Sequence, residues 1–96
     1  MTTTFDHAKR NWTLTHRGLD FAVDAEKVLS GDTVTVVDDR FDYGEVRRVS
    51  AGFLDDRMVV IVWTWRDTSR HIISMRYCHE KEKKRWRKIF RQAGHR

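Results

Sequence analysis

The sequence of 96 residues has no proline and a single cysteine, Cys78. One cysteine cannot form an internal disulfide, and it gives no Cys/His cluster from which a zinc site could be built. Loops must be shaped by Gly, Asp and Asn instead of proline. No apolar run approaches the ~20 residues that a membrane-spanning helix requires. A Gly-rich loop for nucleotide phosphates is also missing. We therefore expect no cofactor, no metal and no membrane partner.

The composition is that of one small globular protein. Hydrophobic residues make up 40% of the chain, with four Trp and five Phe among them, and this supplies a core although 34% of the residues are charged. We expect a single domain over residues 1–96. The N-terminus shows neither the charged nor the apolar region of a signal peptide. The expected location is the cytoplasm.

Positive charge is concentrated near the C-terminus. Residues 79–96 hold eight Lys or Arg and two acids, a net charge of +6, whereas residues 1–78 hold eleven Lys or Arg and twelve acids, a net charge of −1. A strand with Arg and His that leads into a basic helix predicts a polyanionic ligand, and RNA is the simplest choice. The candidate RNA-binding residues on the helix are Lys81, Lys83, Lys84, Arg85, Arg87 and Lys88.

Hydrophobic periodicity and turn residues predict three helices and four strands. The first helix spans 8–17, with a narrow apolar stripe that includes Trp12, and the second runs from a cap at Asp20 to Gly31. The strands span 32–37, 45–53, 58–65 and 70–77, and short turns between them indicate an antiparallel meander. We expect an α+β fold with two N-terminal helices, a four-stranded antiparallel sheet and a basic C-terminal helix over 79–92.

The last predicted strand carries groups suited to phosphodiester chemistry. RNA is cleaved without a metal when a protein activates the 2′-OH, stabilises charge on phosphorus and protonates the leaving oxygen. Arg clamps two phosphate oxygens, and His titrates near neutral pH. Strict alternation places Arg70, Ser74 and Arg76 together on an open face and turns His71 toward the helices, unless a bulge breaks the alternation.

The candidate site residues each have a structural alternative. Arg76 would pair with Glu45 or another acid, His79 would only begin the helix, and Glu82 would orient an Arg rather than act as a base. The charged helix face would simply be solvated. The catalytic candidates are Arg76, His79, Arg70, His71 and Lys9, the substrate-orienting candidates are Ser74 and Glu82, and His16 lies on the helix that would border the cleft.

An ordered set of motifs resembles one known family, the BrnT-type toxins. Its N-terminal half is similar to Phe5-Asp6-x-Ala8-Lys9, Gly18-Leu19-Asp20-Phe21 and the region of Ala25. Its middle is similar to Asp42-Tyr43-Gly44-Glu45-x-Arg47, Gly52 and the run 58–64. Its most recognisable motif is similar to Ile72-Ile73-Ser74-Met75-Arg76, followed by Glu82 and Trp86. The resemblance covers about residues 5–88.

The resemblance implies a ribonuclease of RelE-like fold, the toxin of a type II toxin–antitoxin pair. It also implies a small DNA-binding antitoxin as partner, and contact with operator DNA only through that antitoxin. The chain departs from the family at two places. His16-Arg17-Gly18 stands where the family often has Lys-His-Gly, and His71 stands where it usually has Arg. If that Arg grips the scissile phosphate, the active site of this chain is altered.

The leading hypothesis is a metal-independent endoribonuclease toxin that inhibits translation. Arg76, with Arg70 or Lys9, would hold the scissile phosphate, and His79 or His71 would move protons. The alternative is a non-catalytic RNA-binding or partner-binding module on the same fold, which the loss of Arg at position 71 suggests. A third interpretation is a structural protein whose basic helix docks on an acidic partner.

Overall fold

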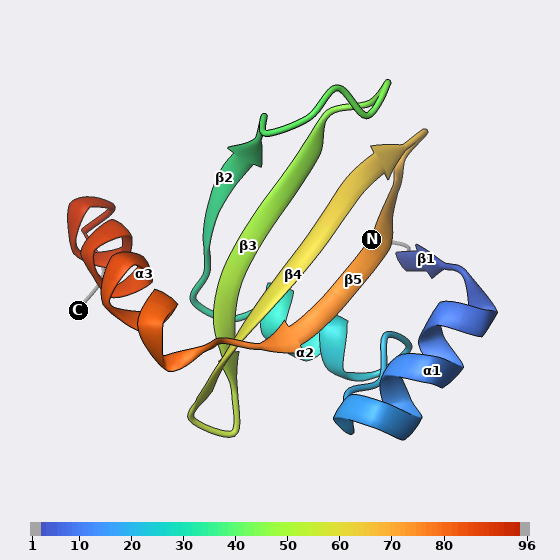
Figure 1. Ribbon diagram of the computed structural model, residues 1–96, viewed down its shortest axis with the longest axis horizontal. Helices are drawn as coiled ribbons and strands as arrows, with labels where there is room; N and C mark the ends of the chain where they lie inside the picture. Colours follow the sequence, from blue (N-terminus) through green and yellow to red (C-terminus); the bar gives the residue numbers. More distant parts are fainter. Residues whose placement is uncertain (1–2, 95–96) are drawn as a thin grey trace.

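The computed structural model describes residues 3–94, which form one sheet with helices on both of its sides (Figure 1). In chain order the elements are β1 (Thr3–Phe5), α1 (His7–Arg17), α2 (Asp24–Leu29), β2 (Val34–Asp38), β3 (Arg47–Leu54), β4 (Arg57–Arg66), β5 (Ser69–Tyr77) and α3 (Glu80–Gln92). The Asp6 side chain caps α1 by accepting a hydrogen bond from the Lys9 amide, and Gly18 ends the helix with a positive φ of 69°.

The predicted sheet of four antiparallel strands is wrong, because the sheet has five strands and is mixed. Its order is β1-β5-β4-β3-β2. The additional strand, β1, pairs in parallel with β5 and places Thr4 opposite His71. Three residues are too few for an alternating pattern, and a parallel partner 67 residues away leaves no local signal. The second helix is also shorter than predicted, because residues 21–23 form a turn.

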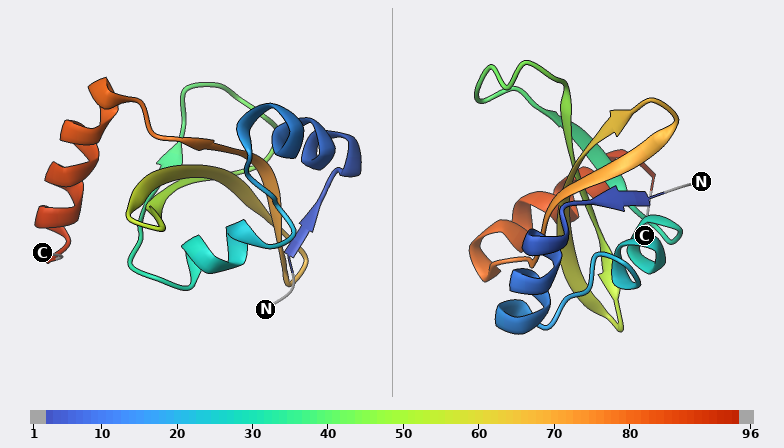
Figure 2. Two further views of the ribbon diagram at one scale, coloured as in Figure 1. Left: turned by 90° about the horizontal axis from the view of Figure 1, so that it is seen from below. Right: turned by 90° about the vertical axis from the view of Figure 1, so that its right-hand side faces the viewer.

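One face of the sheet, called the α2 face here, is covered by α2 (Figure 2). Its core is closed by the segment before α2 as well as by the helix. Gly52 of β3 lets α2 approach closely, since a Cβ there would lie 2.7 Å from the Val28 Cγ1 atom. The buried residues of this core are Leu19, Phe21, Ala25, Val28, Val59, Ile61, Trp63, Ile72 and Met75.

The opposite side of the sheet, called the open face here, is covered by α3 at one end. Trp86 and Phe90 of α3 pack there against Val34, Ala51, Met58 and Val60. Helix α1 lies on this side too, next to β5 and away from α3 (Figures 1 and 2). The apolar stripe predicted for α1 is wrong: Trp12 is exposed, and Thr13 is the buried residue of the helix. On the open face, the exposed part of the sheet therefore lies between α1 and α3.

A bulge in β5 determines which of its side chains lie on the open face. Ser74 pairs with Val62 of β4, but the next pair toward the β4–β5 turn is Trp63 with Ile72, so the register skips Ile73. Such an extra residue shifts the alternation of side chains by one position.

The grouping predicted for Arg70, Ser74 and Arg76 is wrong for this reason. Arg70 lies over the Trp63 ring on the α2 face, with its guanidinium carbon 4.5 Å from the ring centroid. Past the bulge, Met75 belongs to the core of that same face. His71, Ser74 and Arg76 consequently lie on the open face, and His71 is not turned toward α2.

The close approach of α2 and β3 predicts that Gly52→Ala destabilises the fold. The new methyl group would meet Val28 Cγ1 at 2.7 Å and Thr33 Cγ2 at 2.8 Å, and neither atom is the end of a flexible side chain. Overpacking of this kind costs about 1–3 kcal/mol of unfolding free energy, which urea denaturation measures. Gly31→Ala is the control, because its nearest contact would be 3.7 Å. Equal stability of the two variants would contradict the packing described here.

Candidate nucleic-acid site

Three hollows on the open-face side of the molecule share lining residues, and we call them together the groove. The first, of about 280 Å³, lies between β2 and α3. The middle one, of about 420 Å³, lies where β5 leads into α3. The third, of about 190 Å³, lies between α1 and β5. Arg76 lines the first and the middle hollow, and Arg17 lines the middle and the third, so a guanidinium stands at each junction.

The first hollow has an apolar floor and charged walls. Val36, Val49, Val60 and Val62 form the floor, and Arg85 of α3 lies on its wall. On the β2 side the Asp38 carboxylate accepts hydrogen bonds from Arg40 Nε, at 2.9 Å, and from the Tyr43 hydroxyl. The Arg40 guanidinium lowers the pKa of Asp38 to about 2, so this acid stays ionised and paired.

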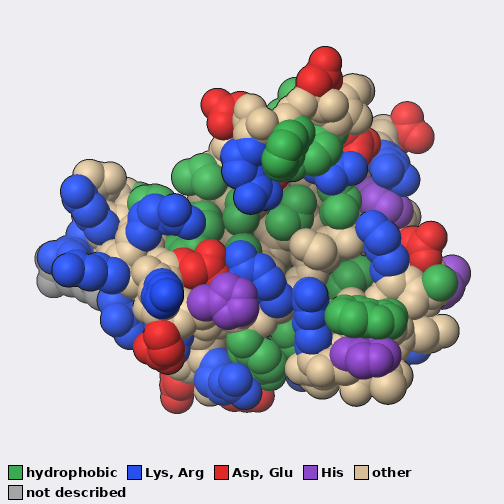
Figure 3. Space-filling model, in the orientation of Figure 1, with side chains coloured by type: hydrophobic (Ala, Val, Ile, Leu, Met, Phe, Trp, Pro, Cys, Tyr) green, Lys and Arg blue, Asp and Glu red, His purple; other side chains and the backbone are tan. Residues whose placement is uncertain are grey.

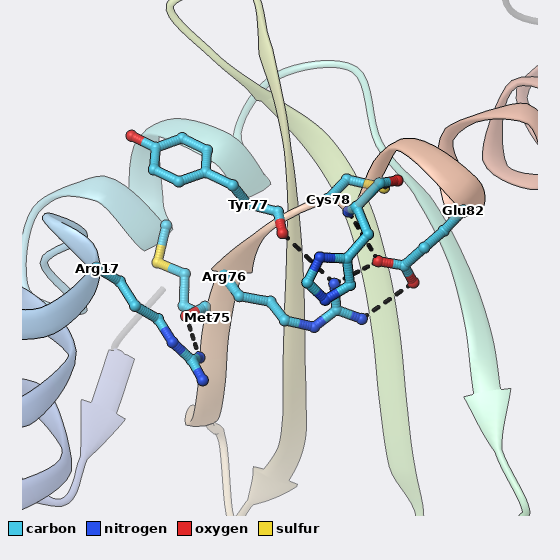
Figure 4. Close-up of polar contacts among 7 residues, drawn as sticks. Arg17, Met75, Arg76, Tyr77, Cys78 and Glu82 are labelled. Atoms are coloured by element: carbon cyan, nitrogen blue, oxygen red, sulfur yellow. Dashed lines mark hydrogen bonds and ion pairs between the residues drawn. The ribbon is translucent and has the colours of Figure 1, made fainter.

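Arg76 is held by a two-pronged ion pair with Glu82 (Figure 4). Its Nη1 atom donates to Glu82 Oε1, and its Nη2 atom lies 3.0 Å from Oε2. Glu82 Oε1 also accepts from the His79 backbone amide at 3.0 Å, at the start of α3. The pair therefore joins the end of β5 to the first turn of α3. The structural alternative for Arg76 is a pair with Glu45 or another acid. The guanidinium does pair with an acid, which is Glu82 rather than Glu45.

The low pKa of Glu82 suits a residue that positions Arg76. The hydrogen bond from Arg76 lowers its pKa from 4.5 to about 2, against the opposing effect of burial. A general base works best when its pKa lies near the pH of the reaction. A carboxylate that is ionised far below neutral pH suits the orientation of Arg76 better than proton transfer.

Two further candidates of the middle hollow come from the ends of helices. His79 immediately precedes α3 and is exposed, and His16 belongs to the last turn of α1. Both line the same hollow as Arg76 and Arg17. The Cys78 thiol lines it as well, and burial raises its pKa, so it stays protonated at neutral pH.

Arg17 is a site residue that the sequence analysis did not single out. Its Nη1 atom donates to the Met75 carbonyl at 3.0 Å, which points the guanidinium at β5 beside Arg76 (Figure 4). The pattern that could have found it is helical spacing, because Lys9, Thr13 and Arg17 are each four residues apart and share one side of α1. These three residues line the third hollow together with Trp12, Ile73 and Ser74.

His71 lies on the open face at the other end of β5. Its Nδ1 atom is 2.8 Å from the Thr4 hydroxyl of β1. Burial lowers the pKa of His71 below 6.5, and the nearby Arg66 lowers it further. The imidazole is accordingly neutral at pH 7. Arg70, the remaining catalytic candidate, lies on the α2 face between Trp63 and Trp65 and not in the groove.

One of the candidate cations of the basic helix lines the groove. Of the six candidates, Arg85 lines the first hollow, while Lys83 pairs with Glu80 at 2.6 Å. The remaining four, Lys81, Lys84, Arg87 and Lys88, are exposed. In the space-filling view, Lys and Arg side chains gather over α3 and between α3 and α1, while acids lie at the β2–β3 loop and also beside α3 (Figure 3).

Two kinds of site are not found in residues 3–94. No three His, Cys, Asp or Glu side chains gather where they could hold a metal ion. None of the helices in this part of the chain is both long enough and apolar enough to cross a bilayer.

A groove with arginines at its junctions, beside a cationic helix, has the charge that suits a polyanion. The class of protein that this defines, a small basic nucleic-acid-binding protein, agrees with the comparison of the sequence with known families. The family model described as "Ribonuclease toxin, BrnT, of type II toxin-antitoxin system" matches residues 5–82. Because that match spans most of the chain, the chain belongs to the BrnT ribonuclease toxin family. A search of curated proteins finds no match.

The Arg76–Glu82 pair predicts how stability depends on pH. The folded state holds Glu82 ionised to about pH 2, whereas a free Glu protonates near 4.5. The stabilisation is thus complete above pH 4.5 and is lost as the pH falls from there toward 2. Glu82→Gln should lower the unfolding free energy at pH 7 by about 1–3 kcal/mol and flatten its fall in this acidic range. Urea denaturation at several pH values measures both effects.

Glu80→Gln is the matched control for this measurement. Glu80 lies on the same helix but its side chain is 87% exposed. An exposed ion pair contributes little to stability, since water screens it. If the two variants show the same pH dependence, the ion pair does not hold the end of β5 to α3.

Proposed function

We propose that the chain is a metal-independent endoribonuclease toxin that cleaves RNA in the groove of the open face and thereby inhibits translation. The observation that carries this proposal is the placement of Arg76. Glu82 fixes its guanidinium between two hollows, with Arg17 and His79 beside it. Membership of a ribonuclease toxin family supports the reaction class.

The proposed reaction needs no group beyond the side chains and the RNA. The 2′-oxygen attacks the adjacent phosphorus and loses its proton, the bond from phosphorus to the 5′-oxygen breaks, and that oxygen gains a proton. Arg76 and Arg17 stabilise the additional negative charge on the phosphate oxygens. His79 exchanges the protons, because it lines the same hollow as both arginines.

The remaining candidates have supporting roles in this proposal. Lys9 and Ser74 line the third hollow and would bind the RNA strand next to the scissile phosphate. The α3 cations would attract the backbone. We leave Arg70 outside the proposed site, because its guanidinium lies over two Trp rings on the α2 face. His71 lies too far along β5 to share the middle hollow, of which it is not a lining residue.

The proposal includes a protein partner. A cognate small DNA-binding antitoxin would neutralise the toxin by covering the groove and the basic side of α3, and operator DNA would be reached only through it. An acidic segment would match the cations of that surface. A ribonuclease that acts on the RNA of its own cell would work in the cytoplasm.

Arg76→Ala is expected to lower kcat/KM for RNA cleavage by about 10²–10³-fold, because the charge formed on the phosphate loses its donor. Cleavage of a labelled RNA by the purified protein measures this effect, and circular dichroism checks that the variant is folded. Lys27→Ala is the control, since it also removes one positive charge but Lys27 is an exposed residue of α2, on the other side of the sheet. A folded Arg76→Ala protein that cleaves at the normal rate would exclude the proposed site.

The same assay distinguishes a binding module from an enzyme. A wild-type protein that binds RNA with a steep dependence on salt, but yields no cleavage product, would favour the non-catalytic alternative.

The two histidines are expected to differ in their effect on the rate. His79→Asn should lower kcat by about 10²-fold, because a general acid–base group is lost. His71→Asn should change kcat less than tenfold, because His71 contacts Thr4 at the far end of β5. Single-turnover cleavage across pH 5–9 measures both variants. The reverse order of effects would assign the proton transfer to His71 instead.

A further inference from the structure

Trp12 is a large aromatic residue that the fold leaves exposed. Half of its surface is accessible (50%), although it lies on α1, one side of which faces β5. It lines the third hollow of the groove, beside Lys9 and Arg17. Neither the chain's membership of the BrnT family nor the cleavage chemistry proposed above gives Trp12 a role.

The indole is held in a fixed position despite its exposure. The His16 ring stacks on it, with centroids 4.4 Å apart and planes inclined by 16°. His16 in turn donates from Nδ1 to the Trp12 carbonyl at 2.8 Å. The Arg17 guanidinium carbon lies 5.1 Å from the indole centroid, and Arg17 is itself anchored to the Met75 carbonyl. An aromatic group that is already immobilised loses little entropy when a ligand stacks on it.

The groups around Trp12 have the chemistry of a nucleotide site. Lys9 and Arg17 supply two cations for a phosphate, and Ile73, at the bulge of β5, supplies an apolar contact. The Ser74 hydroxyl, also in this hollow, makes no side-chain hydrogen bond to any residue in 3–94 and is available to a base edge or a ribose. A flat apolar surface next to two cations, of which Arg17 is anchored, and a hydroxyl suits a base and its phosphate better than a peptide side chain.

We propose that the third hollow binds one unpaired nucleotide of the RNA, with its base stacked on Trp12 and its phosphate held by Lys9 and Arg17. The proposal rests on the proposed function in one respect: Arg17 also lines the hollow that holds Arg76, so the nucleotide is a neighbour of the scissile phosphate. The site selects single-stranded RNA, because a paired base cannot leave its stack to reach the indole.

The test combines a change in the protein with a change in the RNA. A short single-stranded RNA with 2′-O-methyl riboses has no nucleophile and is not cleaved. It is made in a series in which one nucleotide at a time is abasic. Equilibrium affinities are measured for wild type, Trp12→Ala, Trp12→Phe and Trp65→Ala. Trp65 is a matched control, since it is 40% exposed and lies with Arg70 on the α2 face.

We expect Trp12→Ala to weaken binding of the intact RNA about tenfold, Trp12→Phe to retain most of the affinity, and Trp65→Ala to bind as wild type. One abasic position should weaken wild-type binding about tenfold and have no further effect in Trp12→Ala, since both changes remove the same contact. Unchanged binding by Trp12→Ala would overturn the proposal. The proposal would also be overturned if the effects of Trp12→Ala and of the abasic position were additive. Trp12 would then affect binding through the structure of the protein and not through contact with that base.

The outcome is independent of whether the protein cleaves RNA. Coupling between Trp12 and one base, in a wild-type protein that leaves ordinary RNA intact, would support the nucleotide site and refute the proposed ribonuclease. Cleavage without coupling would support the ribonuclease and refute the nucleotide site.

Discussion

The extra residue in β5 determines which of its side chains reach the side of the sheet that carries the proposed site. Ile73 is skipped in the register with β4, so the side chains before and after it alternate out of step. Without this bulge, Arg76 would share a face with Arg70 and Ile72 and would point at the core beneath α2. With it, Arg76 and Ser74 reach the open face, where α1 and α3 stand on either side. Arg76 and Ser74 line the groove because one residue of β5 is skipped in the pairing with β4.

The ion pair between Arg76 and Glu82 then converts this placement into a defined geometry. An arginine free in solution samples many rotamers, and binding a phosphate would require it to give up that freedom. Glu82 removes the freedom in advance, and it does so from the first turn of α3, which the backbone amide of His79 also fixes. The cost is that a carboxylate lies beside the proposed phosphate position. Arg17, anchored to a backbone carbonyl rather than to an acid, keeps its charge uncompensated on the other side.

The sequence predicts this protein well where signals are local and poorly where they are not. Caps such as Asp6 and Gly18 and the apolar run of β4 mark their elements within a few residues. The strand Thr3–Phe5 escapes detection because its partner is β5, about 67 residues away, as the Thr4–His71 contact shows. The bulge escapes it too, since Ile72 and Ile73 look alike in any hydrophobic pattern. Arg76 and Glu82 were both candidates, but their pairing depends on how α3 turns away from the sheet.

The net charge of each part of the sequence does not show which residues give the groove its positive charge. Residues 1–78 have a net charge of −1, yet they supply Lys9, Arg17 and Arg76, three of the cations that line the groove outside α3. Two acids of the same segment, Asp38 and Asp39, line the first hollow with Arg76, but Arg40 already pairs with Asp38 there. The middle and third hollows are lined by Arg17, Lys9 and Arg76 and by no Asp or Glu. Within a Debye length of about 8–10 Å, such local placement counts for more than the total. The attraction that we propose for a polyanion would therefore come from the topology that gathers α1, β5 and α3 on one face, and the basic C-terminal helix would reinforce it.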